Sequence, residues 1–348
     1  MATAAQRRIK SVSYAKYGYL FTAPFFIVYF IFMLWPLLQT FILAFYGNGS
    51  AAKVSTPTTI DDFVGLSNFN TILFGGDTIK SQGIHDDVVM CLKNTVLIWV
   101  GNFIPQICLS LLLAVWFTDL RVKMPGKGFF KVVMYMPNII TAASVAGLFM
   151  CLFGDSQYSV ANTLLVGKGL MAEPYHFVSQ MWSSRILVMF IQVWMWFGNT
   201  MIMLMSGIQG INESLFEAAE IDGANSRQTF WKITFPLLKS IMVYTLLTSM
   251  IGGLQMFDIP YMFHTGSTLN DYIKTLAVFI YEKFHKDYMS PSYGYSAAAS
   301  VLLFIITSIL GALVFYVQRD KDAIEINKKK KAARKDAKRR AAKGGLGL

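Results

Sequence analysis

The chain has 348 residues, of which 54% are hydrophobic and 15% are charged, and its formal net charge is +11. The apolar share is higher and the charged share lower than in ordinary soluble domains, so the composition excludes that class and indicates a chain that lies in a bilayer. The three scattered cysteines, Cys91, Cys108 and Cys151, exclude a disulfide framework and a Cys-x-x-Cys metal site.

Six apolar runs are each long enough to cross about 30 Å of hydrocarbon as a helix, which takes roughly 20 residues. They occupy residues 19–45, 92–117, 129–153, 185–209, 237–257 and 294–318. The first run is longer than the apolar part of a signal peptide, and no A-x-A-like cleavage site follows it, so we expect a permanent span. The predicted fold class is an all-α, polytopic transmembrane helical bundle with six spans.

The distribution of basic residues predicts the orientation of these spans, because lysine and arginine collect on the cytoplasmic side. The amino-terminal segment 1–17 and the connection between the second and third spans are basic, whereas 46–90 carries five aspartates against two lysines. We therefore expect a cytoplasmic amino terminus, a transmembrane domain over 18–318 and a cytoplasmic tail over 319–348.

The tail accounts for most of the net charge. Residues 319–343 hold twelve basic side chains against four acidic ones. We expect this segment to be disordered and attracted to anionic membrane lipid; because it directly follows a span, this interpretation is favoured over a nucleic-acid arm.

No motif of the chain predicts catalysis. The Gly-Lys-Gly triplets at 126–128 and 167–169 lack the pattern of a phosphate-cradling loop, and no catalytic constellation or metal-ligand spacing stands out. We therefore expect no enzymatic activity, no metal site and no cofactor bound by this chain.

A polar segment over 212–236 separates the fourth and fifth spans. Ser214 and Glu217 fit a capping box, which predicts the start of a helix. Gly223 predicts its end, since glycine accepts the left-handed backbone of helix termini. Asn225 or Ser226 is expected to cap a second short helix that leads to Pro236, the first turn of the fifth span. The segment is predicted to be a helical elbow.

The composition of this elbow indicates a docking surface. Glu213, Glu217 and Glu220 share one face at helical spacing and can meet basic side chains. Small Ala218 and Ala219 permit close approach of another surface. The segment also has more apolar residues than a solvated loop needs: Leu215, Phe216, Ile221, Phe230 and Trp231. In the alternative interpretation, Glu217 only caps its own helix, a contribution of about 1 kcal/mol.

The elbow resembles the EAA loop of the membrane subunits of bacterial ABC importers. The matching residues are Glu217, Ala218, Ala219, Gly223, Ile233 and Pro236, with Phe235 in the place of the usual leucine. The resemblance covers roughly residues 15–320. The stretches 257–261, 264–266 and 293–298 are similar to the carbohydrate-uptake group, such as the maltose and glycerol-phosphate permeases.

This resemblance implies a type I importer permease in the bacterial plasma membrane. The implied partners are a second permease chain, two ATPase subunits that carry ATP and Mg, and an extracellular solute-binding protein that docks on the loops 46–90, 154–184 and 258–293. Glu217 would pair with a basic residue of the ATPase and Gly223 would make the turn, so that closure of the ATPases moves the membrane helices.

Polar side chains within spans are costly unless they face protein or water, so they mark a candidate pathway. Gln192, Trp196 and Asn199 recur at i, i+4 and i+7, on one helix face. The other candidates are Gln255, Asp258 and Asn138. Amides beside aromatic rings suit sugars, whose hydroxyls donate and accept while their C–H faces pack on rings, and the resemblance implies the same lining. Hydrogen bonding between helices is the alternative role.

We expect the substrate to be a carbohydrate, and specifically an oligosaccharide. The spans lack mid-membrane carboxylates for a cation and buried lysine or arginine for phosphate, which disfavours a non-sugar importer and also a secondary transporter or membrane enzyme. Anionic glycosides stay open, because the partner chain can supply the opposite charge.

Overall fold

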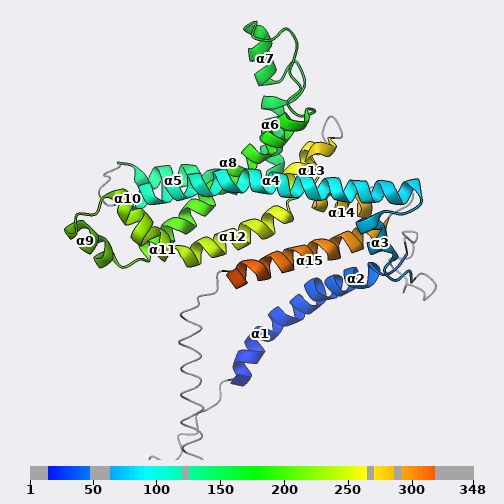
Figure 1. Cartoon of the computed structure of the whole chain (residues 1–348), viewed down its shortest axis with the longest axis horizontal. Helices are drawn as coiled ribbons and strands as arrows, with labels where there is room; N and C mark the ends of the chain where they lie inside the picture. Colours follow the sequence, from blue (N-terminus) through cyan, green and yellow to red (C-terminus); the bar gives the residue numbers. More distant parts are fainter. Residues whose placement is uncertain (1–14, 48–62, 120–124, 265–269, 286–291, 318–348) are drawn as a thin grey trace, which may run out of the picture. The chain divides into compact units, whose positions relative to one another are not determined.

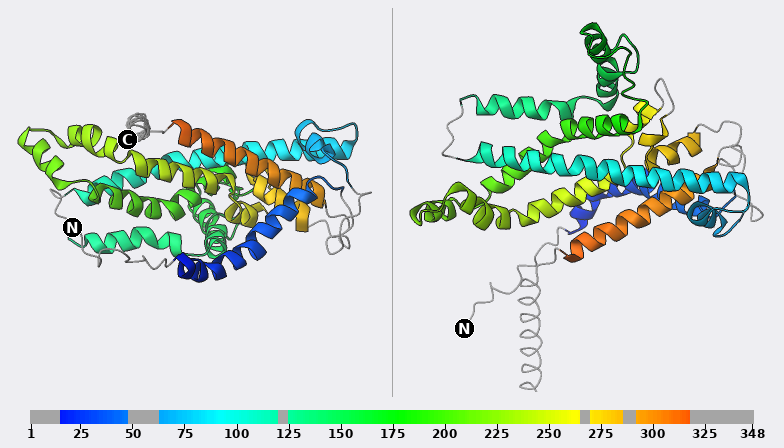
Figure 2. Two further views of the ribbon diagram at one scale, coloured as in Figure 1. Left: turned by 90° about the horizontal axis from the view of Figure 1, so that it is seen from below. Right: turned by 45° about the horizontal axis from the view of Figure 1, so that its top comes forward.

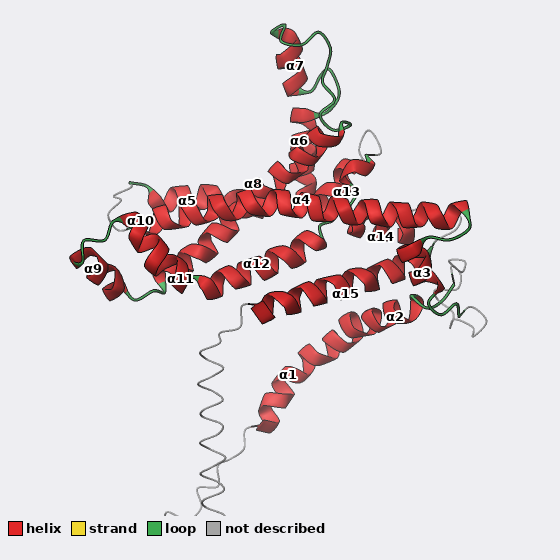
Figure 3. Cartoon of the chain, viewed as in Figure 1, coloured by secondary structure: helices red, strands yellow, loops and turns green. Residues whose placement is uncertain are grey.

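The computed structural model describes residues 15–47, 63–119, 125–264, 270–285 and 292–317. Every regular element within these residues is a helix, as the sequence predicted, apart from one isolated bridge between Tyr46 and Phe63. Figure 3 shows this helical content along the chain. The predictions for the amino-terminal 1–14, the basic connection 120–124, Thr265, Gly266 and the tail from 318 lie outside the described residues.

Five helical segments of the described residues are long and apolar enough to cross a membrane. They are Tyr17–Leu43, Ile79–Thr118, Met181–Gln209, Lys239–His264 and Tyr293–Tyr316. These segments agree with the first, second, fourth, fifth and sixth predicted spans.

The third predicted span is not one straight helix. Helix α5 (Lys127–Tyr135) passes through the 3-10 turn η5 (Met136–Ile139) and is followed by α6 (Ala142–Phe153), with a bend of 94° between the two parts. Ile140 leaves the helix with an extended backbone, and Thr141 caps α6 by accepting a hydrogen bond from the Ser144 amide. Apolar composition alone could not reveal this break.

The second span begins earlier than its apolar run. Helix α4 covers Ile79–Thr118, 40 residues, so the acidic residues near its start are helical and not in a loop. At 1.5 Å per residue such a helix is about 60 Å long, twice the hydrocarbon thickness.

The described chain divides into two compact units, and the first comprises residues 1–93 and 274–304. It contains α1 (Ala15–Tyr29), the π-helical turn η2 (Phe30–Leu34), α2 (Trp35–Leu43), α3 (Ser67–Phe74), α14 (Leu276–His285) and the first half of α15 (Tyr293–Val317). Asn68 of α3 donates to the carbonyls of Ala44 and Tyr46 at 3.0 and 2.7 Å, which ties α3 to the end of α2.

The second unit comprises residues 94–273 and 305–348, and helix α8 (Met181–Gln209) is central to its packing. Ser110 of α4 donates to the Phe197 carbonyl at 2.8 Å, and Gly198 meets the backbone of Met134 so closely that a side chain would not fit. Two apolar clusters include residues of α8, one around Ile191 and one around Leu204. Figures 1 and 2 show α8 running beside α5 and α12 (Lys239–Leu254).

The segment after α6 is a hydrogen-bonded hairpin that carries α7 (Val160–Gly167). The fully buried Asn162 donates to the carbonyls of Gly154, Ser156 and Tyr175 and accepts from the Tyr175 amide. One polar side chain thus holds both ends of the hairpin together.

Candidate functional site

The elbow begins with a different cap from the one the sequence suggested. Helix α9 covers Glu213–Ile221, and the side chain of Asn212 accepts a hydrogen bond from the Ser214 amide at 3.1 Å. The Ser214–Glu217 capping box is therefore wrong. Asparagine is as good an N-cap residue as serine, because its side-chain carbonyl accepts hydrogen bonds from the exposed amides of the first turn.

The end of α9 is as expected. Gly223 has a φ of 74°, its amide donates to Glu220, and the Ala224 amide donates to Ala219. These two bonds form a Schellman motif, whose left-handed residue is usually glycine. Asn225 then caps α10 (Ser226–Thr229) through a capping box with Gln228, which confirms the predicted second helix.

The second arm of the elbow continues past α10 without a sharp stop. The π-helical turn η6 (Phe230–Thr234) leads into α11 (Phe235–Leu237), which contains Pro236, and α12 follows. Pro236 therefore lies in the short helix before the fifth span. In this wide turn the Phe235 amide donates a hydrogen bond to the Phe230 carbonyl. In an α-helix the same amide would donate to the carbonyl of Trp231.

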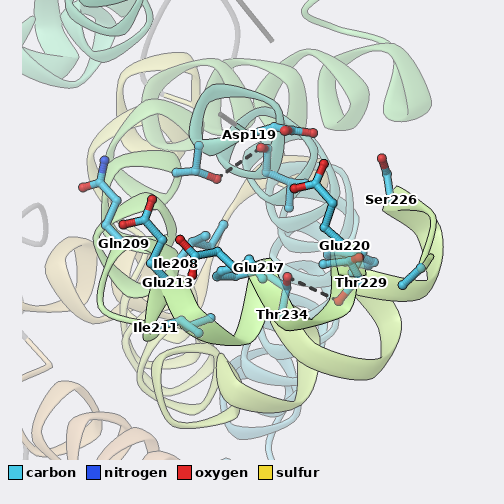
Figure 4. A pocket seen from close by; sticks show the side chains of 15 residues that line it. Asp119, Ile208, Gln209, Ile211, Glu213, Glu217, Glu220, Ser226, Thr229 and Thr234 are labelled. Carbon is cyan, nitrogen blue, oxygen red and sulfur yellow. Dashed lines mark hydrogen bonds between the residues drawn. The ribbon is translucent and has the colours of Figure 1, made fainter. Parts of the chain in front are cut away.

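Four carboxylates surround a hollow of about 510 Å³ at the elbow. Glu213, Glu217 and Glu220 come from α9, Asp119 directly follows α4, and Figure 4 shows them around the opening. Within the described part of the chain, the carboxylates of the three glutamates make no hydrogen bond or ion pair. Glu217 lies in the second turn of α9 and caps nothing, so the alternative in which it serves only as a cap is excluded.

The other residues of the EAA pattern differ in burial. Ala219 is buried and Ile233 is half-buried, whereas Ala218, Gly223 and Pro236 are exposed. Large apolar side chains also stay exposed here, with Ile221 at 86% and Trp231 at 56%. The elbow thus presents acidic and apolar groups that its own unit does not cover.

A second, polar cavity of about 560 Å³ lies within the same unit. It is lined by five of the six residues predicted to face the substrate: Gln192, Trp196, Asn199, Gln255 and Asp258. The first three come from α8, Gln255 caps α12, and Asp258 opens α13 (Asp258–His264). Asn138, half-buried in η5, is not among the lining residues.

Sequence reasoning missed the contribution of α4 to this cavity and most of the contribution of α12. Asn102 and Gln106 of α4 line it, as do Tyr244, Thr245, Thr248 and Ser249 of α12. The spacing of Asn102 and Gln106 at i, i+4 inside an apolar run was a usable signal. Asp258 is the single charged side chain among the described lining residues.

A hydrogen-bond network positions the chain that follows α13. Arg185 of α8 donates to the Tyr272 carbonyl at 2.9 Å and to Asn94 Oδ1 at 2.7 Å, and Asn94 donates to the Asp271 carbonyl at 2.8 Å. The turn η7 (Asp271–Ile273) is thereby attached to α4 and α8.

Comparison with known proteins finds relatives along almost the whole chain. The family described as "Binding-protein-dependent transport system inner membrane component" matches residues 94–322. The chain is 29% identical over 324 residues to the lactose transport system permease protein LacF of Rhizobium radiobacter, which covers 92% of this chain and 100% of the relative. It is also 29% identical over 315 residues to the arabinooligosaccharides transport system permease protein AraP of Bacillus subtilis (strain 168), with 90% and 92% coverage.

A solved structure has the same fold. It is that of a bacterial alginate ABC transporter in complex with alginate pentasaccharide-bound periplasmic protein, with a TM-score of 0.72, 20% identity, and coverage of 90% of this chain and 98% of that one.

Proposed function

Since the chain belongs to the family of binding-protein-dependent transport system inner membrane components, we propose that it is the permease subunit of an ATP-driven importer of a neutral oligosaccharide. The family match confirms the resemblance drawn from the EAA pattern, and it makes the chain a membrane-embedded transport subunit. We also propose which partners the chain has, how it is oriented in the membrane and which substrate it transports.

The elbow is the docking site for an ATPase subunit. The observation that carries this assignment is the group of acidic residues Glu213, Glu217 and Glu220, which face a hollow without a partner in the described chain. Carboxylates in this state gain most from a basic side chain on another protein, since charge-assisted hydrogen bonds are stronger than neutral ones. ATP and Mg belong to that ATPase.

The remaining partners follow from the architecture of such importers. A second permease chain completes the pathway, two ATPase subunits bind the two elbows, and an extracellular binding protein delivers the substrate. The amino terminus, the elbow and the tail lie in the cytoplasm, in agreement with the basic segments of the sequence.

The lining of the polar cavity supports a neutral sugar as substrate. It offers amides and hydroxyls together with the rings of Trp196 and Tyr244, and its single charge is the acidic Asp258. An anionic glycoside would meet repulsion from Asp258 there, and no lysine or arginine is among the described lining residues to compensate its charge. The names of the lactose and arabinooligosaccharide relatives support the same substrate class.

Co-purification of the ATPase with the permease tests the docking assignment. We expect Glu217→Ala and Gly223→Val each to lower ATPase recovery and ATP-dependent uptake while the chain stays in the membrane. Glu173→Ala, an exposed glutamate in the hairpin after α7, is the matched control and should keep both. Normal assembly and transport in both elbow variants would refute the assignment.

An uptake assay in membranes that lack the ATPase tests the energy source. We expect no accumulation of sugar there. Persistent accumulation would favour a secondary transporter instead.

A further inference from the structure

Two buried amide side chains that line the polar cavity stand apart from the other buried amides of the described residues. Asn102 of α4 is 5% exposed and Gln192 of α8 is 7% exposed, and both line the cavity. Neither makes a hydrogen bond to the described residues, whereas five other buried amide side chains do: Asn68, Asn94, Gln106, Asn162 and Asn270. The two exceptions therefore fall in the same cavity.

The amide atoms of these two side chains remain accessible from the cavity. Among the described residues, the fully buried side-chain nitrogen or oxygen without a hydrogen bond is Trp99 Nε1, and it belongs to neither amide. Gln106, one turn further along α4 in the same cavity, has the hydrogen bond to protein that buried amides usually make, because it donates to Thr200 Oγ1 at 2.8 Å. Asn102 and Gln192 are thus available to a molecule that enters the cavity.

We propose that Asn102 and Gln192 form a pair that binds sugar hydroxyls, with Asn102 as the specificity-determining residue on α4. This inference rests on the proposed function and names the groups that recognise its substrate. Each amide presents one acceptor oxygen and two N–H donors, which match neighbouring hydroxyls that donate and accept at once. Trp196 and Tyr244 line the same cavity and are exposed, so their rings can pack on the C–H faces of the sugar.

The pair also explains how the cavity can discriminate between substrates. A site built to hydrogen-bond a hydroxyl rejects an analogue without it, because the buried polar groups of the site are then left unpaired. Since neither amide carries charge, the pair selects neutral hydroxyl groups and gives no compensation to a carboxylate or phosphate.

The test uses the full transporter with its ATPase and binding protein, reconstituted in liposomes. Lactose, arabinotriose and maltotriose are the probes, and the readouts are sugar uptake per ATP hydrolysed and the thermal unfolding midpoint of the purified complex. We expect Asn102→Leu and Gln192→Met each to lower uptake per ATP about tenfold, the effect of one lost hydrogen bond of typical strength. Their midpoints should stay close to that of the wild type, because neither substitution removes a hydrogen bond to the described residues.

The matched variant is Gln106→Met, which removes a bonded amide from the same cavity and should lower the unfolding midpoint. If Asn102→Leu lowers the midpoint and leaves uptake per ATP unchanged, Asn102 is structural and the inference is wrong. If the wild-type transporter takes up none of the three probes, the proposed carbohydrate substrate is wrong. The proposal that Asn102 and Gln192 bind sugar hydroxyls is then wrong as well.

Discussion

Gly253 of α12 packs against the indole ring of Trp99 on α4 so closely that a β-carbon on the glycine would overlap the ring. This contact lies beside the polar cavity, which Gly253 lines. We predict that Gly253→Ala destabilises the protein by about 1 to 3 kcal/mol, the usual cost of overpacking a close contact. Thermal unfolding of the purified chain in detergent measures the effect.

Gly252 provides the control for this prediction. A β-carbon at Gly252 would meet nothing within 4 Å, although it is the adjacent residue of the same helix. Gly252→Ala should keep or raise stability, since alanine favours a helix over glycine by about 1 kcal/mol. Equal losses in the two variants would contradict the role of the Trp99 contact.

The left-handed backbone of Gly223 predicts that two substitutions at this residue differ in their effect on ATPase docking. Asparagine tolerates a φ of 74° better than other residues, whereas a β-branched side chain is strongly disfavoured there. Gly223→Asn should therefore keep most ATPase recovery, and Gly223→Val should lose it. The measurement is quantitative co-purification from membranes with equal amounts of each permease variant. Equal ATPase recovery with the asparagine and valine variants would show that ATPase docking does not depend on the Schellman turn.

A buried ion pair predicts a mutational rescue in the first unit. Lys274 Nζ lies 2.8 Å from Glu282 Oε2, and both side chains are nearly covered. Lys274→Met should cost about 3 to 5 kcal/mol because it removes the cation that compensates the charge of the buried glutamate. The double variant Lys274→Met/Glu282→Leu should recover most of the loss in thermal unfolding. A double variant as unstable as the single one would show that the pair is needed for more than charge balance.

The same pair predicts a pH dependence. Burial, the largest influence, lowers the pKa of Lys274, but the hydrogen bond and charge of Glu282, followed by Cys91 and Asp87, outweigh it, so the pKa lies above its ordinary value. A raised lysine pKa means that the stabilisation is complete below the unfolded-state pKa of about 10.4 and is lost as the pH rises through the folded-state value. The unfolding midpoint of the wild type relative to the double variant should stay constant from about pH 7 to 9 and fall above about pH 10.5. A relative fall at neutral pH would contradict the sign of the shift.

Asn162 predicts a local effect in the hairpin after α6. Its side chain makes four hydrogen bonds at 2.8 to 3.3 Å that join the two ends of the hairpin. Asn162→Ala leaves buried groups unpaired, at about 1 to 3 kcal/mol each. Hydrogen exchange over 154–180 should rise while α12 keeps its protection. Gln157→Ala, an exposed position in the same hairpin, should change neither region.

Most of the fold could be predicted from apolar run length, because a spanning helix needs little beyond roughly 20 apolar residues. The errors arose where the helix geometry depends on something other than hydropathy. The break at Ile140 and the early start of α4 at Ile79 are backbone features that apolar counts do not contain. The cap at Asn212 was missed because Ser214 offered an equally good local pattern.

The candidate site divides in the same way. The elbow was predictable because caps and turns involve residues three to six positions apart, as in the Gly223 motif. The cavity was only partly predictable. Helical periodicity grouped Gln192, Trp196 and Asn199 on one face, but it could not show that Asn102 faces them from another helix or that Asn138 does not.

The sequence by itself determined the membrane class, the number of apolar segments, the elbow and the family, because each depends on local composition or on a short motif. Only the tertiary structure decided which polar side chains share a cavity and which of them lack a partner. Asn102 and Gln192 are far apart along the chain, and whether a buried amide is bonded depends on the neighbours that helix packing brings to it.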